Sequence, residues 1–129
     1  MRNYVNYTIF SAEGEKDTGI NVLCEDFKNA VFSLSSATNA TFKIKFQGSI
    51  SDSAPSFDAA QTATNQWDYI QIVDLENGDV IDGDTGVSFT DDDVRQFEAN
   101  INGLRWINAT ITDYTDGAIT LITKLYNNQ

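Results

Sequence analysis

The sequence predicts an all-β fold, an antiparallel β-sandwich of jelly-roll type that forms a single domain over residues 1–129. Three observations support this prediction. About nine short segments alternate apolar and polar residues and are separated by turn signals, a pattern typical of sandwiches and jelly rolls. Residues 66–75 combine aromatic and β-branched side chains, and the hairpin dipeptide Asn77-Gly78 follows them. A chain of this length can also bury a core without disulfides.

The first three strands are expected at residues 4–10, 20–24 and 27–36. In the first, apolar side chains at alternate positions give one packed face and one mixed face. Residues 11–19 are polar, contain glycine and predict a loop. The alternation continues through Cys24, which indicates a buried thiol acting as a small hydrophobe.

Residues 41–47 show the most regular alternation in the chain. Phe42, Ile44 and Phe46 fall on one face, and two lysines fall on the other. A strand with one apolar face needs a second sheet to cover it, so this segment favours a sandwich.

Residues 48–65 form the longest irregular stretch and contain the single proline, Pro55. A loop of this length in a small domain is more often functional or contact-forming than idle. Phe57 is expected to anchor the loop, and a short helical turn over residues 57–61 is an open alternative.

Residues 66–75 are expected to form one central strand around which the chain is organised. Apolar side chains lie on both of its faces, with Trp67, Tyr69, Val73 and Leu75 on one and Ile70 and Ile72 on the other. One explanation is a mid-sheet strand that is covered on both sides. The other is that one face makes a protein–protein contact.

Residues 79–82 are expected to return from the Asn77-Gly78 turn as its partner strand, and residues 87–89 form another short strand. Over residues 94–101 the periodicity fits a helix or a strand, and a strand is favoured because the surrounding elements are β.

Two more strands are expected at residues 104–112 and 118–126. In the first of them, three apolar side chains alternate inward, and Leu104 and Trp106 lie on the opposite face.

The formal charge of −11 comes from 8 basic and 19 acidic residues. It argues against nucleic acid and anionic membranes as partners, because both attract positive charge. No apolar run approaches the roughly 18 residues of a membrane span. The first residues lack the apolar core of a secretory signal, and their alternation indicates the first strand instead.

The sequence has no histidine and none of the common catalytic motifs, so we expect no enzymatic activity and no cofactor. Paired carboxylates leave a small hydrolase as a remote alternative. Asp82-Gly83-Asp84 and residues 91–93 could supply oxygen ligands to Ca²⁺, although their spacing does not match an EF-hand loop. Trp67 and Trp106 could form an aromatic platform for sugars.

The run from Phe42 to Tyr126 resembles small proteins encoded in the structural gene blocks of tailed bacteriophages. The resemblance covers about two-thirds of the chain and rests on short segments in a fixed order. They are Phe46-Gln47-Gly48-Ser49, Ala54-Pro55, Phe57-Asp58-Ala59-Ala60, Asn65-Gln66-Trp67-Asp68-Tyr69-Ile70-Gln71, Ile81-Asp82-Gly83-Asp84-Thr85-Gly86-Val87 and Asn102-Gly103-Leu104-Arg105-Trp106-Ile107.

The resemblance implies a β-sandwich structural protein of the virion, assembled in the host cytoplasm. A chain with one cysteine and no secretory signal suits cytosolic assembly. The first hypothesis is a head decoration or auxiliary capsid subunit that binds other virion proteins, as a homo-oligomer in a symmetric assembly. A neck or tail protein is the nearest variant, and a carbohydrate-binding module for host-surface glycans is the alternative. The residues expected to make contacts are Trp67, Tyr69, Leu104 and Trp106, together with residues 51–65.

Overall fold

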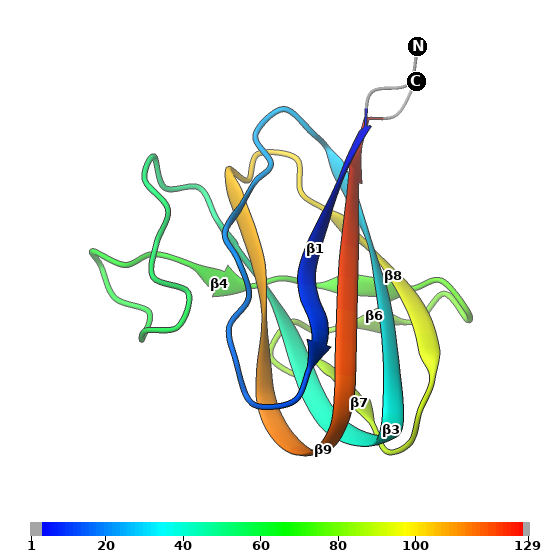
Figure 1. Cartoon of the computed structure of the whole chain (residues 1–129). Coiled ribbons are helices and arrows are strands. Elements are labelled where there is room, and N and C mark those ends of the chain that lie inside the picture. The colour runs from blue at the N-terminus through cyan, green and yellow to red at the C-terminus, as the bar shows by residue number, and fades with distance from the viewer. Residues whose placement is uncertain (1–3, 128–129) are drawn as a thin grey trace.

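The computed structural model describes residues 4–127 and contains nine strands in one antiparallel sheet (Figure 1). No helix occurs within these residues, so the predicted all-β class is confirmed. Residues 1–3 and 128–129 of the expected domain lie outside the described residues. The strands are β1 (Tyr4–Glu13), β2 (Val22–Leu23), β3 (Asn29–Ser49), β4 (Asp68–Tyr69), β5 (Ile72–Asp74), β6 (Val80–Ile81), β7 (Val87–Phe89), β8 (Val94–Asn100) and β9 (Trp106–Tyr126).

Two long strands organise the fold. β3 and β9 each contain 21 residues and pair antiparallel from Asn29 opposite Tyr126 to Ser49 opposite Trp106. The expectation of separate strands at residues 27–36 and 41–47 is therefore wrong, since both belong to β3. The separate strands expected at residues 104–112 and 118–126 are likewise wrong, since both belong to β9. The backbone bends between the two segments of β3 and continues its pairing with β9.

The bend in the β3–β9 ribbon has an identifiable cause. The register shifts between Ala37 and Thr41, where Thr38 and Asn39 adopt positive φ angles of 63° and 60°. On β9, Gly117 has a φ of 105°, and a Cβ built on it would lie 2.4 Å from the Cα of Ala40. Such close approach is open to glycine alone. The extra residues on β3 form a bulge that turns the ribbon back on itself.

The bend divides the sheet into two layers. The first layer contains the N-terminal half of β3 and the C-terminal half of β9, with β1 beside β9 and with β8, β5 and β6 in order beyond β3. The second layer contains the other halves of β3 and β9, with β4 and β7 beside β3 and β2 beside β9. A single sheet thus makes both layers of a sandwich.

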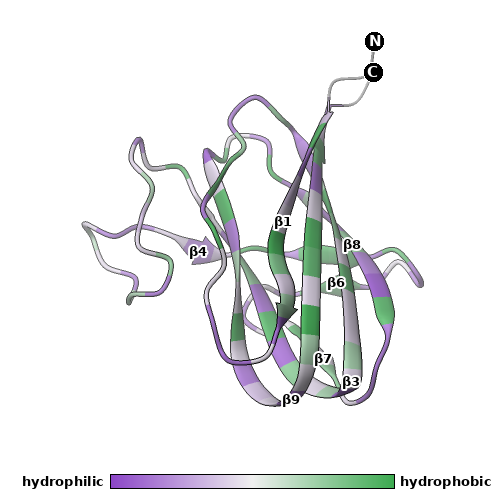
Figure 2. Ribbon diagram, in the orientation of Figure 1, coloured by the Kyte–Doolittle hydropathy of each residue, from purple (hydrophilic) through white to green (hydrophobic). Residues whose placement is uncertain are grey.

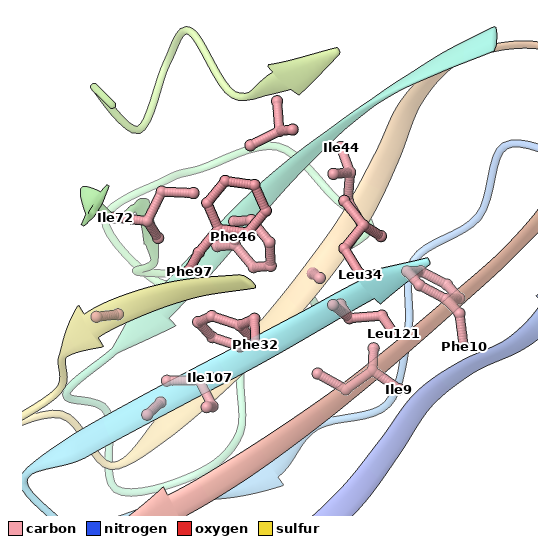
Figure 3. Packing of buried hydrophobic residues seen from close by; sticks show 14 of the residues in the cluster. Ile9, Phe10, Phe32, Leu34, Ile44, Phe46, Ile72, Phe97, Ile107 and Leu121 are labelled. Atoms are coloured by element: carbon pink, nitrogen blue, oxygen red, sulfur yellow. The ribbon is translucent and has the colours of Figure 1, made fainter. Parts of the chain in front are cut away.

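The core lies between the two layers (Figure 3). Phe32 and Phe46 belong to opposite halves of β3, yet their ring centroids are 4.4 Å apart. Phe97 of β8 lies 6.3 Å from Phe46 across the same space. The ribbons alternate hydrophobic and hydrophilic residues along β3 and β9 (Figure 2), and the predicted inward residues Phe42, Ile44, Phe46, Ile107, Ala109 and Ile111 are all buried.

The expected central strand at residues 66–75 is wrong as a single element. Its first part, β4, pairs with β3 in the second layer, whereas β5 pairs with β8 in the first. This segment therefore crosses from one layer to the other, and the explanation of one mid-sheet strand covered on both sides is wrong. The protein–protein contact stays a prediction. Apolar residues occur on both faces because the segment changes its partner half-way, and Leu75 is left exposed.

The hairpin predicted at Asn77-Gly78 is confirmed. Gly78 has a φ of 80°, and β5 and β6 pair on either side of the turn. Residues 94–101 are a strand as favoured, since β8 covers Val94–Asn100.

Two local expectations need correction. The strand expected at residues 20–24 is reduced to Val22–Leu23, and Ile20 is exposed. Residues 57–58 form a turn, and residues 57–61 contain no helix. Cys24 is fully buried as predicted, and burial raises the pKa of its thiol to about 12.

Within residues 4–127 we find no helix that could cross a lipid bilayer.

Candidate functional site

Polar side chains lie buried on the outer face of the second layer. Gln47 and Asn108 are cross-strand neighbours on β3 and β9, and both are 0% exposed. Ser49, two residues along β3, is 4% exposed. An outward-facing polar residue is normally solvated, so another segment must cover these three.

Two loops provide that cover. The Gln47 amide nitrogen donates to the Phe57 carbonyl at 2.8 Å, and the Ser49 hydroxyl donates to the Gln66 carbonyl at 2.6 Å. From the β1–β2 connection, the Gly19 carbonyl accepts a hydrogen bond from the Asn108 amide nitrogen at 3.1 Å. The buried polar residues therefore fasten both loops onto the sheet.

The loop of residues 50–67 projects from the sheet beside β4 (Figure 1) and is held by a few specific contacts. Phe57 is 4% exposed, which confirms its predicted role as the anchor. The Trp67 indole N–H donates to the Ala59 carbonyl at 3.1 Å, and the Trp106 indole N–H donates to the Ser51 carbonyl at 3.0 Å.

The structure brings three of the four predicted contact residues together. Trp67 packs edge to face against Tyr69, with ring centroids 5.0 Å apart and an interplanar angle of 81°. Leu104 lines a hollow of about 330 Å³ together with Trp67. Trp106 lines neither this hollow nor a second, larger hollow that is described below. Its indole N–H instead holds the loop of residues 50–67 through the Ser51 carbonyl. All four side chains are half-buried.

The larger hollow has a volume of about 470 Å³ and lies between the two covering loops. Its lining combines three aromatic rings with neutral polar side chains and one carboxylate: Phe57, Trp67, Tyr69, Gln47, Gln61, Thr18, Thr110, Thr112 and Asp58, with Ala59 and Ala60. A third hollow of about 430 Å³ shares four of these residues, so the two form one elongated depression. We call it the loop groove.

Two residues of the loop groove were missed by the sequence analysis. The Gln47 amide oxygen and the Thr112 hydroxyl are buried and have no hydrogen-bond partner in the protein. Such atoms are few in a folded protein and call for an explanation, such as a water molecule or a ligand. The alternation pattern could not have found them, because their burial depends on loops that fold back over the strands.

Tyr69 is neutral at physiological pH. Burial raises the pKa of its phenol, and the negative charge of Asp84 raises it further. The Lys45 ammonium lies 4.8 Å from the centroid of the Tyr69 ring. The phenol can therefore both donate and accept a hydrogen bond.

The acidic residues considered for Ca²⁺ have structural contacts of their own. Asp92 accepts hydrogen bonds from the backbone N–H groups of Asn39 and Ala40 at the β3 bend. In the part of the chain that the structure describes, neither predicted acidic run belongs to a group of three carboxylates close enough to share an ion.

A different acidic cluster does meet that distance. One carboxylate oxygen from each of Glu13, Glu15 and Asp17 lies within 4.8 Å of the others. The pKa of Glu13 is raised, first by burial and then by its two acidic neighbours. Exposed acidic groups commonly gather without a metal, and the cluster contains no buried ligand that would define a site.

Comparison with known proteins gives a fold likeness. No family model matches the chain, and a search of curated proteins finds no match. The SPBc2 prophage-derived protein YomS superimposes with a TM-score of 0.70 at 14% identity, covering 97% of this chain and 94% of YomS. This chain therefore has the same fold as YomS. The PBSX exported protein XepA gives a TM-score of 0.73 at 12% identity over 96% of this chain, which corresponds to 38% of XepA.

Proposed function

We propose that this chain is a non-enzymatic structural protein of a bacteriophage particle, of the head decoration or auxiliary capsid type. The observation that carries the proposal is the likeness to prophage-derived YomS over nearly the full length of both chains. The short segments that resemble phage structural proteins support the same origin. The subunit would bind other virion proteins in a symmetric homo-oligomeric assembly.

The likeness to XepA supports a role as a building block. The whole sandwich corresponds to 38% of that longer chain, so the same fold also occurs as one part of a larger protein. A neck or tail position is the nearest variant of the proposal.

An exposed apolar surface suits contact with other subunits. Leu23 and Trp106 are cross-strand neighbours, and Leu23 is 42% exposed. Ile50, next to the Ser51 carbonyl that holds Trp106, is 71% exposed. Copies of a chain with a charge of −11 repel one another, so assembly needs apolar contacts of this kind.

The proposal is tested by quantifying the chain in purified particles of the phage that encodes it. We expect a high and fixed copy number by mass spectrometry, and density for the sandwich in a particle reconstruction. Leu23→Asp and Ile50→Asp should lower incorporation, whereas Thr8→Asp on β1 of the first layer should not. Absence of the chain from intact particles would reject the proposal.

A further inference from the structure

We propose that the loop groove binds a neutral oligosaccharide. The inference stands on the groove itself and does not require that the chain belong to a particle. A sugar ring presents an apolar face of C–H groups and an edge of hydroxyls that both donate and accept hydrogen bonds. The groove offers a matching surface for each of these two features.

The aromatic side of the groove is held in place before any ligand arrives. The Trp67 indole is fixed by its hydrogen bond to the Ala59 carbonyl and by edge-to-face packing on Tyr69. The Phe57 ring also packs near the indole, with ring centroids 6.0 Å apart. A fixed ring costs little conformational entropy on binding, which is the advantage of a preorganised site. An exposed portion of this platform can stack against the C–H face of a sugar.

The polar side of the groove contains hydrogen-bonding groups without partners. The Gln47 amide nitrogen is committed to Phe57, which fixes the orientation of the amide and leaves its oxygen as an acceptor. Gln47 is 0% exposed and lines the groove. Thr112, whose buried hydroxyl also has no partner in the protein, lines both hollows of the groove. A sugar hydroxyl can donate to Gln47 and can either donate to or accept from Thr112.

The charges around the groove favour an uncharged ligand. Asp58 lines both hollows, and Asp17 and Lys16 line the second. The acidic groups outnumber the basic one, and the whole chain carries −11. Sulfated, phosphorylated or carboxylated ligands would be repelled. The shared lining of the two hollows makes the groove elongated, which suits several linked sugar units better than one.

The test is a binding titration of the full chain against a panel of short neutral oligosaccharides built from glucose, galactose, mannose or N-acetylglucosamine, with sulfated versions beside them. We expect saturable binding of a neutral member, and weaker binding of its sulfated version. Trp67→Ala should weaken binding by about tenfold or more. Trp106→Ala is the matched control, because this indole also holds the loop but does not line the groove.

A second pair of variants separates ligand contact from folding. Thr112→Val removes a buried hydroxyl that has no protein partner, so its melting temperature should stay equal or rise. Binding should nevertheless fall by about threefold or more. Thr8→Val, on the other layer, should leave binding unchanged. Lack of saturable binding by every panel member, equal losses in Trp67→Ala and Trp106→Ala, or full binding by Thr112→Val would each overturn the proposal.

Discussion

The two layers of the sandwich share one core but differ in what covers their outer faces. On the first layer, outward-facing side chains remain in contact with solvent, and Ile122 is 42% exposed. On the second layer, Gln47 and Asn108 occupy equivalent outward positions and are 0% exposed. The difference comes from residues 14–21 and 50–67, which contact these side chains of the second layer and bury them.

This difference shows how loops that cover one face of a sheet can create a candidate binding groove there. An open outer face makes few specific contacts, whereas a covered face must satisfy every polar group that it buries. The second layer satisfies most of them through Gln47, Ser49 and Asn108. Two of the buried side-chain atoms without a hydrogen-bond partner, the Gln47 amide oxygen and the Thr112 hydroxyl, belong to residues that line the groove.

The largest effect is expected in the core that both layers share. Phe46 is 1% exposed and contacts the rings of Phe32 and Phe97 across the layers. Phe46→Ala should lower the free energy of unfolding by about 3–5 kcal/mol, measured by urea denaturation. Ile44→Val, a smaller deletion in the same strand, should cost about 1 kcal/mol. Equal costs would mean that the layers do not pack through Phe46.

The bend that creates the two layers should be almost as sensitive. Gly117→Ala places a methyl group at a φ of 105° and 2.4 Å from the Cα of Ala40. We expect a loss of about 3 kcal/mol, because strain and overlap with the backbone combine. Gly103→Ala is the control, with a φ of 95° and no atom within 4 Å of the added Cβ. It should cost about 1 kcal/mol, so similar melting temperatures for the two variants would argue against a tightly packed bend.

A third pair compares the outer faces directly. Gln47→Ala removes a buried hydrogen bond to the loop and leaves the Phe57 carbonyl without its donor. The cost should be about 2 kcal/mol, accompanied by faster hydrogen exchange in residues 50–67. Ser33→Ala, which faces outward from the first layer, should change stability by less than about 0.5 kcal/mol. If both variants behave alike, the loops do not cover the second layer in solution.

The all-β class and most inward positions could be predicted because alternation is a local property. Phe42, Ile44 and Phe46 form a period of two that identifies the buried face without any tertiary information. The bend could not be predicted in this way. Thr38 and Asn39 look like the end of a strand, and the role of Gly117 depends on Ala40, far away in the sequence.

The candidate site was only partly predictable for the same reason. Trp67 and Tyr69 could be predicted as contact residues because they are large aromatic side chains next to a long irregular segment. The structure packs their two rings together. Gln47 and Thr112 look like ordinary outward-facing strand residues. Their importance arises from loops that cover them, so it depends on contacts that no local pattern encodes.

The smallest expected effect concerns the open face of the first layer, where a titratable contact lies at the surface. The Tyr126 hydroxyl donates to the Glu98 carboxylate at 2.5 Å, and this hydrogen bond, with burial and the charge of Glu98, raises the pKa of Tyr126 to about 12. The unfolded phenol has a pKa of about 10, so the native state holds its proton more tightly. The contribution to stability is therefore complete below about pH 10 and is lost as the pH rises towards 12.

Tyr126→Phe should cost about 1 kcal/mol of stability at pH 7. In urea denaturation, the difference in unfolding free energy from the wild type should shrink between about pH 10 and pH 12. Glu98→Gln should weaken the same dependence, and a pH-independent difference would show that the contact does not form.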